Sequence, residues 1–363
     1  MRALLVVRPD AAVRPGGDLV HAQRTNDALR ALGVETDLVA DDAPDPRGYD
    51  VAHVFGIFQP ETAQRQIGAI RAHRVPLVLS PIWLDLRALF ATQGRVQHAL
   101  AARDPVQVER RLRRLREIEP SLPWRGSIAR NADRRLAAQR ALALEADVLL
   151  PASEIEAYLY GERLRVQSVP FVVAPLGVDE EAFGIARAPE RAGVLCAARV
   201  ESKKNQAALL YALRDVEVDV TIVGNAYDPA YLALCRRWAT PRTRFVDHAS
   251  HDEVLAMMAR AAVHAHPSWL ESPGLSSLEA AGTGARIVVG DRGTEREYFG
   301  ADVDYADPAD PASIRAAVLR ALARAPRERD DALERRLAAR TWRRTAEATL
   351  EGYERAVASR RTR

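Results

Sequence analysis

Cysteine, lysine and long apolar runs are all scarce in this sequence. Its 363 residues include two cysteines, too few for a disulfide framework or a cysteine metal site, which indicates a protein of the reducing cytoplasm. Every apolar run is far shorter than the ~20 residues that a membrane-spanning helix needs. The opening stretch 1–9 holds five consecutive apolar residues before Arg8, so we expect a first strand there and not a signal peptide.

A strong excess of charge is absent as well. The formal net charge of +3 is too small to indicate nucleic-acid binding by itself. The two lysines, Lys203 and Lys204, are adjacent, whereas every other basic residue apart from histidine is an arginine. A GC-rich genome is the simplest reason for that bias, and a site that prefers a compact ammonium to a planar guanidinium is the alternative. The length exceeds one ordinary core, and a hydrophobic content of 48% can fill two domains.

The first half of the sequence alternates short apolar runs with helical segments. Residues 3–7 suit a buried parallel strand, and a loop that ends in Gly16-Gly17-Asp18 precedes an amphipathic helix at 19–32. Further strand-like runs are 36–39, 51–55, 77–79 and 148–150. This rhythm predicts an open parallel α/β sheet, whose ligand crevice lies at the carboxyl ends of the strands. Adjacent glycines let a backbone approach a phosphate closely, although a plain tight turn is equally consistent with them.

A second sheet is predicted to start with a strand at 193–198, and two cations follow it. Arg199 and Lys204 flank a turn at the carboxyl end of this strand. Cations in that place can hold a diphosphate and offset the charge that develops as it leaves. The alternative is an exposed turn that is rich in charge.

The stretch 264–290 carries two carboxylates that are separated by seven residues. Pro273-Gly274 interrupts any continuous helix, so we expect Glu271 in a loop and Glu279 inside a helix that starts between them. The free N–H groups at a helix start favour phosphate, and flanking carboxylates accept hydrogen bonds from hydroxyls. A nucleotide-sugar combines both groups, whereas two solvated glutamates on a surface helix are the alternative.

Several of these stretches resemble the retaining glycosyltransferases of family 4 (glycosyl transferases group 1), which have the GT-B fold. The run E-S-P-G-L-S-S-L-E-A-A-G-T-G resembles the family's Glu-x7-Glu signature, and R-V-E-S-K-K-N-Q resembles its Arg and Lys pair. The loop G-G-D-L-V-H, the crossover VPFVVAPLGVDEEAF and the final helix from residue 341 match as well. Pro273 departs from the family's usual aromatic, and 80–83 replaces a His that many relatives carry beside the reacting sugar. His53 and His98 are either substitutes for it or structural residues.

The resemblance implies two Rossmann-like domains with parallel sheets facing across a cleft, at 1–183 and 184–340, with 341–363 returning to the first domain. It also implies a retaining enzyme that moves a sugar from a nucleoside-diphosphate sugar to a hydroxyl acceptor. The setting would be bacterial cell-surface polysaccharide, glycolipid or natural-product glycosylation. Neither a cofactor nor a metal is expected, since Asp302-Val-Asp304 lies beyond the site loops.

The same resemblance gives each site residue a role. Arg199, Lys204 and the backbone N–H groups of 274–276 would stabilise the departing diphosphate. Glu271 would bind hydroxyls of the donor sugar, and Glu279 those of the ribose. The remaining residues implied to contact the donor are Gly16 and Gly17 on the phosphate, Gly274, Leu275 and Ser276 in the N–H set, and Val246 and His248 near the nucleobase.

Other functions remain open on the sequence alone. A nucleotide-sugar epimerase of the same fold and a non-catalytic nucleotide-sugar-binding subunit are the two alternatives. The segment 101–140 has eleven arginines against five acidic residues, and we predict a helical pair on the acceptor-binding domain. It is either a solvated face or a dock for an anionic membrane surface or lipid pyrophosphate, which would place the enzyme at the inner face of the membrane.

Overall fold

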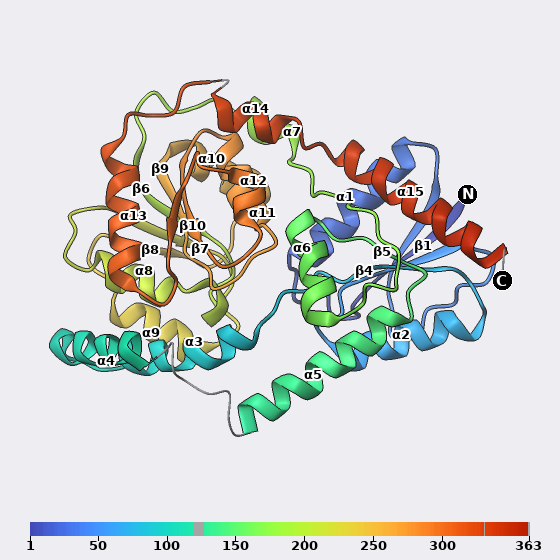
Figure 1. Cartoon of the computed structure of the whole chain (residues 1–363). Helices are drawn as coiled ribbons and strands as arrows, with labels where there is room; N and C mark the ends of the chain where they lie inside the picture. Colours follow the sequence, from blue (N-terminus) through green and yellow to red (C-terminus); the bar gives the residue numbers. More distant parts are fainter. Residues whose placement is uncertain (119–126, 330, 362–363) are drawn as a thin grey trace. The chain divides into compact units, whose positions relative to one another are not determined.

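The computed structural model describes residues 1–118, 127–329 and 331–361, which form two compact units (Figure 1). Unit 1 comprises Met1–Asp85, Arg130–Gly177 and Arg340–Arg363, and unit 2 comprises Leu86–Ala129 and Val178–Ala339. Each unit has one parallel sheet covered by helices, so the predicted fold class of two Rossmann-like domains is confirmed.

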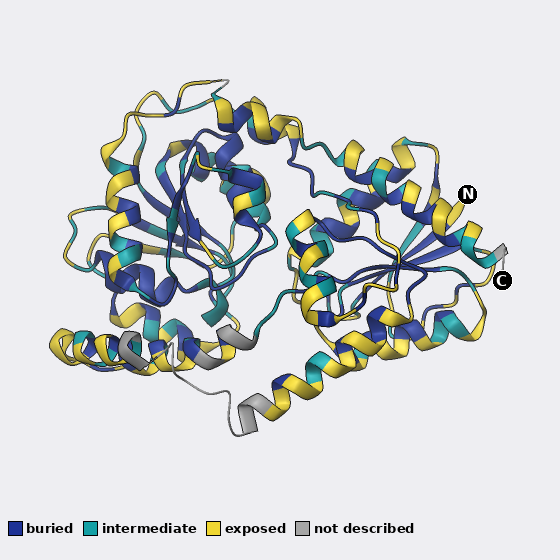
Figure 2. Cartoon of the chain, viewed as in Figure 1, coloured by how far each residue is buried: buried dark blue, intermediate teal, exposed yellow. Residues whose placement is uncertain are grey.

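The sheet of unit 1 has the strand order β2-β1-β3-β4-β5, and all of its pairings are parallel. The strands are β1 (Arg2–Val7), β2 (Glu35–Ala40), β3 (Val51–Phe55), β4 (Leu77–Ser80) and β5 (Val148–Leu149). Every residue of β3 and β4 is buried (Figure 2), which is why both strands are mostly apolar and do not alternate between apolar and polar residues. The strand order reverses between β1 and β3, so the ligand crevice of this unit is expected at their carboxyl ends.

The helices of unit 1 complete the doubly wound layer. They are α1 (Gly17–Ala31), α2 (Pro60–Ala72), α5 (Ser127–Leu144, grouped here from Arg130), α6 (Glu154–Leu159), the π-helical turn η2 (Tyr160–Leu164) and α15 (Trp342–Arg361). The terminal helix α15 packs against α1 and β5. Thr345 of α15 donates a hydrogen bond of 2.6 Å to the carbonyl oxygen of Pro175, which fastens this late helix to an early segment.

The sheet of unit 2 has the order β11-β10-β9-β6-β7-β8 and is also parallel. Its strands are β6 (Ala192–Ala197), β7 (Val220–Val223), β8 (Thr243–Val246), β9 (Ala261–His266), β10 (Arg286–Gly290) and β11 (Asp304–Ala306). The order reverses between β6 and β9, which are direct neighbours. Their carboxyl ends therefore mark the expected ligand crevice of unit 2.

The helices of unit 2 are shorter and more numerous. They are α3 (Arg87–Leu100), α4 (Pro105–Ile118), α7 (Glu180–Gly184), the 3-10 turn η3 (Ser202–Lys204), α8 (Gln206–Leu213), α9 (Pro229–Arg237), α10 (His251–Arg260), α11 (Leu275–Gly282), α12 (Glu295–Phe299), α13 (Pro311–Ala323) and α14 (Ala332–Ala338). Cys196 and Cys235 are free and buried in this unit. Within the described residues, no helix is long and apolar enough to cross a membrane.

The first part of the Arg-rich segment belongs to unit 2, which corrects its predicted placement on the acceptor-binding domain. Val108 and Leu112 of α4 are buried in the same core cluster as α8 and α9. Glu109 accepts a hydrogen bond of 2.7 Å from Tyr211, and Trp238 donates one of 2.9 Å to Leu100. An amphipathic pattern shows that α4 buries one face, but it does not show which core receives that face. The part of the segment at 119–126 lies outside the described residues.

Candidate functional site

The two strands at the reversal point of unit 2 bring Lys204 and Glu271 together. Lys204 follows β6 and Glu271 follows β9, and the ammonium nitrogen lies 2.6 Å from carboxylate Oε1. Burial alone would raise the pKa of Glu271, but the charges of Lys204 and Lys203 outweigh it and hold that pKa well below its ordinary value. Glu271 is therefore an anion at any physiological pH and a poor general base.

Hydrogen bonds between the two loops fix this ion pair. The carbonyl oxygen of Lys203 accepts from the backbone N–H of Trp269 at 2.9 Å and from the Ser268 hydroxyl at 3.0 Å. Asn205 has a left-handed backbone (φ 63°), and its side-chain amide donates to the carbonyl oxygen of Pro267 at 3.1 Å. The turn that carries Lys204 is thus held from both sides, and of the two lysines it is Lys204 that contacts Glu271.

Two polar side chains that the sequence analysis did not single out also surround Glu271. The Ser268 hydroxyl donates to Oε1 at 2.6 Å, and His266 Nε2 lies 3.7 Å from the same oxygen. Burial, followed by the charge of Lys204, lowers the pKa of His266 to about 3, so the imidazole is neutral. His266 is the last residue of β9 and Ser268 lies two positions beyond it, and this position at a strand's carboxyl end was the signal that could have revealed them.

Glu295 at the start of α12 is a third residue that sequence reasoning did not identify as part of the site. Its side chain is 1% exposed, and neither carboxyl oxygen has a hydrogen-bond partner among the described residues. Burial raises the pKa of Glu295 well above its ordinary value, which favours the neutral acid. A Cβ on Gly293 would lie 2.3 Å from Glu295 Oε2 and 2.2 Å from the Glu271 carbonyl oxygen. Gly293 therefore lies close to both the buried acid and the backbone of Glu271.

Arg199, the predicted partner of Lys204, does not contact Glu271. Its side chain is 37% exposed and pairs with Glu201 at 3.2 Å. Both cations of the predicted phosphate site thus have carboxylate partners in the structure. A diphosphate that binds here would either replace these carboxylates as the partners of the two cations or contact the cations beside them.

The helix α11 begins at Leu275, directly after Gly274, so Glu271 lies in a loop and Glu279 in a helix, as predicted. Gly274 has φ of +90°, a conformation that other residues rarely adopt, and a Cβ there would approach Glu271 Cγ to 3.4 Å. Leu275 and Ser276 are in the first turn, where backbone N–H groups lack acceptors within the helix. The geometry therefore offers an anion-binding turn beside the Lys204–Glu271 pair.

Glu279 is on α11 together with two residues from other elements. The carboxylate oxygens of Asp179 and Glu279 and a ring nitrogen of His251 all lie within 4.8 Å of one another. We call these three residues the Glu279 group. His251 Nε2 is 3.8 Å from Asp179 Oδ2, and the imidazole is half exposed. One imidazole and two carboxylates are a donor set that suits zinc or manganese, and Glu279 can also accept a hydrogen bond from a hydroxyl.

The remaining predicted residues belong to other elements than those that carry the Lys204–Glu271 pair. Val246 ends β8, and His248 is exposed just beyond it. Gly16 and Gly17 belong to unit 1, where Gly16 caps α1. Asp18 in that first turn pairs with Arg8 at 2.6 Å, so a carboxylate already lies near the positive end of α1.

The two candidate substitutes for the family histidine differ in their surroundings. His53 in β3 is buried, with one ring nitrogen 2.9 Å from the Tyr353 hydroxyl and the other 2.9 Å from that of Ser80. Burial lowers its pKa well below the ordinary value. These bonds occupy both nitrogens, as expected of a structural histidine. His98 is exposed on α3 of unit 2.

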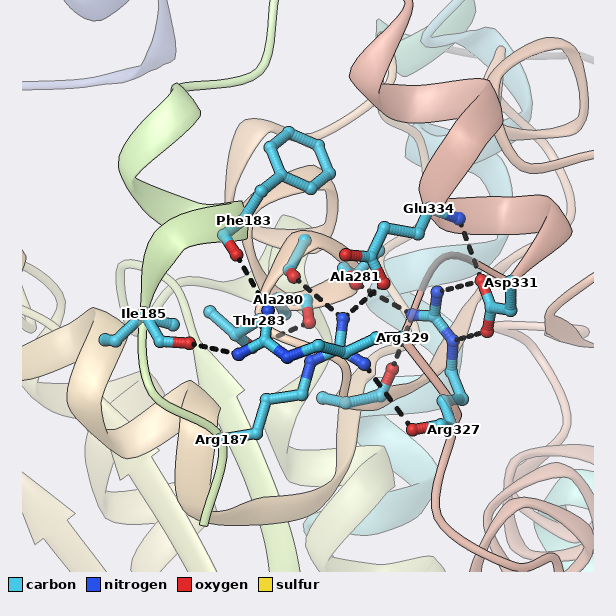
Figure 3. Close-up of polar contacts among 12 residues, drawn as sticks. Phe183, Ile185, Arg187, Ala280, Ala281, Thr283, Arg327, Arg329, Asp331 and Glu334 are labelled. Carbon is cyan, nitrogen blue, oxygen red and sulfur yellow. Dashed lines mark hydrogen bonds and ion pairs between the residues drawn. The ribbon is translucent and has the colours of Figure 1, made fainter.

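Arginines hold the end of α11 that is opposite the anion-binding turn (Figure 3). Arg327 donates to the carbonyl oxygen of Ala281 at 2.8 Å and forms a two-pronged ion pair with Asp331 at 2.6 Å. Arg187 donates to the carbonyl oxygen of Gly282 at 3.4 Å. Positive charge at this end complements the negative pole of the helix. The helix that starts after Gly274 and carries Glu279 is therefore held at its C-terminal end by these arginines.

Part of the chain is similar in sequence to a known family of enzymes. Residues 191–324 match the sequence profile of the family described as glycosyl transferases group 1. A curated relative, MMP alpha-(1->4)-mannosyltransferase of Mycolicibacterium hassiacum, is 27% identical over 258 residues. That match covers 67% of this chain and 63% of the relative, so it spans just under two thirds of the relative's length.

Solved structures match over the whole chain at low sequence identity. Sucrose-phosphate synthase from Thermosynechococcus elongatus has a TM-score of 0.60 at 17% identity and covers 100% of this chain and 98% of its own. Anabaena Alr3699/HepE, solved in complex with UDP and glucose, has a TM-score of 0.61 at 14% identity, with 100% and 97% covered. At these identities the likeness concerns the fold, and both structures share it.

Proposed function

From the premise that the chain is a group 1 glycosyltransferase with the GT-B fold, we propose that it transfers a sugar from a nucleoside-diphosphate sugar to a hydroxyl acceptor with retention at the anomeric carbon. The observation that carries this proposal is the Lys204–Glu271 pair, which lies where the strand order of unit 2 reverses. A cation for phosphate and a carboxylate for hydroxyls meet there beside the first turn of α11. The curated relative is named a mannosyltransferase, which supports transfer over the other reactions of this fold.

The leaving diphosphate is the group that this site stabilises. Lys204, aided by Arg199 and the N–H groups of Gly274, Leu275 and Ser276, would offset the negative charge that develops as the glycosidic bond breaks. Side-chain cations then supply what a bound metal supplies in other transferases, and we propose a metal-independent reaction. In this mechanism the departing phosphate takes the acceptor's proton, which removes the need for a histidine base.

The carboxylates are assigned to hydroxyl recognition. Glu271 stays ionised beside Lys204, so it can accept hydrogen bonds from the donor sugar but is unsuited to remove a proton. Glu279 would accept from the ribose hydroxyls, with His251 and Asp179 close to it. Backbone groups around Val246 and His248 would contact the nucleobase, and Gly16-Gly17 the donor phosphate.

The test is the variant Lys204→Met. Losing one cationic contact to the diphosphate should cost ~2–4 kcal/mol in the transition state, or roughly 30- to 1,000-fold in kcat/KM. Arg244→Met is the control, because this exposed arginine lies on β8, away from the pair. Full transfer activity in Lys204→Met would contradict the assignment.

Product analysis distinguishes transfer from its alternatives. Proton NMR of the product should show the anomeric configuration of the donor, whereas an inverted product would exclude retention. Sugar isomerised without an acceptor would indicate an epimerase, and no donor turnover with an intact site would indicate a binding subunit. Thermal shifts with UDP, GDP, ADP and TDP should identify the donor base.

We also propose a cytoplasmic enzyme that contacts anionic membranes at its periphery. The exposed arginines Arg103, Arg110, Arg113 and Arg114 on and beside α4 support this, since basic helices are attracted to anionic lipid. Co-sedimentation with anionic vesicles that disappears in the variant with all four arginines changed to glutamine is the expected result. Binding that persists in the variant would contradict it.

A further inference from the structure

Unit 1 has its own reversal point, and an exposed aromatic residue lies there. The strand order reverses between β1 and β3, and the loop 56–59 follows β3 directly. Phe58 in this loop is 53% exposed although most large apolar residues of the unit are buried. The carboxyl ends of the strands at a reversal point are where doubly wound sheets bind ligands. The place of this ring, rather than its exposure alone, makes it a candidate ligand contact.

A guanidinium covers one face of this ring. The Arg135 Cζ atom lies 4.3 Å from the centroid of the Phe58 ring, and Arg135 also donates a hydrogen bond to the Phe58 carbonyl oxygen. Cations prefer the face of an aromatic ring, so the stacking fixes both side chains. The ring keeps much of its surface open to solvent, as its exposure shows.

The loop that presents Phe58 is fixed by the next turn of the same helix. Gln139 of α5, four residues after Arg135, donates to the carbonyl oxygen of Ile57 at 3.1 Å. The Gln139 side-chain oxygen accepts from the buried indole of Trp83 at 2.9 Å. Successive turns of α5 therefore fix successive residues of the loop. A rigid support of this kind is what a binding surface needs.

Arg135 has the features of a cation that awaits an anion. Its Nε is buried without a hydrogen-bond partner among the described residues. Burial lowers the pKa of Arg135 more than the charge of Glu61 raises it. Half-buried cations usually have a carboxylate partner, because desolvation of an unpaired charge is costly. An anionic ligand would remove that cost.

We propose that Phe58 and Arg135 form an acceptor subsite, in which the ring of a sugar-like acceptor packs on Phe58 and its carboxylate or phosphate pairs with Arg135. The proposal rests on the transferase function proposed above and adds the class of acceptor, an acidic sugar or cyclic polyol. The C–H face of such a ring is apolar and suits the open part of Phe58. The planar guanidinium suits the two oxygens of a carboxylate or phosphate.

The experiment compares neutral and anionic sugars on the full chain. Binding of glucose, glucuronate and glucose 6-phosphate is measured by NMR titration for the wild type, Arg135→Gln and Arg134→Gln. Arg134 is exposed and adjacent on the same helix, so it controls for a general loss of positive charge. We expect at least one anionic sugar to bind the wild type and Arg134→Gln about tenfold more tightly than glucose does. Whether glucuronate or glucose 6-phosphate binds more tightly shows whether the acceptor's negative charge is a carboxylate or a phosphate.

The variants separate binding from support of the loop. In Arg135→Gln the anionic preference should fall to about one because the charge contact is lost, whereas glucose affinity should change little because Gln139 still holds the loop. An equal loss for all three sugars would show that Arg135 merely fixes the loop, and an unchanged preference would likewise overturn the proposal. Phe58→Ala should weaken the binding of all three sugars, and Phe58→Trp should bind them as the wild type does. Tyr158 is another exposed aromatic residue of unit 1, and Tyr158→Ala should leave the binding of all three sugars unchanged. Equal binding in Phe58→Ala and the wild type also counts against the subsite.

Donor turnover keeps the two proposals distinguishable. Neither Phe58 nor Arg135 is among the residues proposed above to contact the donor, so nucleotide binding and slow donor hydrolysis should be the same in every variant. If the wild type hydrolyses no donor but shows the anionic preference, the transferase function fails and the subsite stands. If the donor turns over and the preference is absent, the subsite fails alone.

Discussion

Replacing Glu295 by glutamine should make the stability of the protein less sensitive to rising pH. The carboxyl group is 1% exposed, and both of its oxygens lack partners among the described residues. Burial raises its pKa in the folded state well above the value of an exposed glutamate. The unfolded chain loses this proton near pH ~4.3, whereas the folded chain keeps it.

The size of the effect follows from proton linkage. Between the unfolded pKa and the raised folded pKa, the folded state binds one proton more than the unfolded state. The free energy of unfolding must therefore fall as pH rises, by about 1.4 kcal/mol per pH unit, and this loss ends once the folded group ionises. Glutamine has nearly the same shape and cannot ionise, so the variant should lack this slope. Its extra N–H donors add a cost that does not depend on pH.

Denaturant unfolding at pH 5, 6, 7 and 8 measures the difference directly. The variant should gain stability relative to the wild type at each step until the folded carboxyl group ionises, whatever the difference in stability at pH 5. Glu328→Gln is the control, because Glu328 is exposed and should give a flat difference. Parallel curves for the wild type and Glu295→Gln would show that Glu295 titrates normally, and the argument from burial would then be wrong.

Three further predictions concern the same unit. Gly293→Ala should lower stability by about 1–3 kcal/mol and weaken donor binding, because its Cβ would lie 2.2 Å from the Glu271 carbonyl oxygen; Gly184→Ala, with nothing within 4 Å, is the calorimetric control. Arg327→Met should cost about 3–5 kcal/mol in denaturant unfolding, since it leaves the buried end of α11 without its cation, and the exposed Arg260→Met should cost almost nothing. Transfer activity should be unchanged in EDTA, and loss of activity there would contradict a metal-independent reaction. Added Zn²⁺ should weaken nucleotide affinity by binding to the Glu279 group, and His251→Ala should abolish this effect of zinc.

The regular elements were predictable where local chemistry decides them. The apolar run 3–7 became β1, and the helix expected at 19–32 is α1 at Gly17–Ala31. The Pro273-Gly274 break separated Glu271 from Glu279 as expected, because those residues stop a helix wherever they occur. Periodicity and turn residues act over a few positions, and the sequence displays both directly.

The contacts that were missed depend on distant parts of the chain. The sequence shows that α4 buries Val108, but not that the receiving core is that of α8 in unit 2. Arg199 and Lys204 looked equivalent as a pair of cations, yet the fold directs one to Glu201 and the other to Glu271. The buried state of Glu295 depends on the loop around Gly293, which covers it. Such features are set by tertiary packing and have no local pattern.

The Lys204–Glu271 pair also bears on how quickly a donor finds the site. Because Glu271 neutralises Lys204 and Glu201 pairs with Arg199, these residues leave only the charge of Lys203 uncompensated, which is little to attract an anion over a distance. The rate constant for nucleotide association should therefore change little between low and high salt. The affinity would come from contacts made after arrival and would be expressed in a slow dissociation rate.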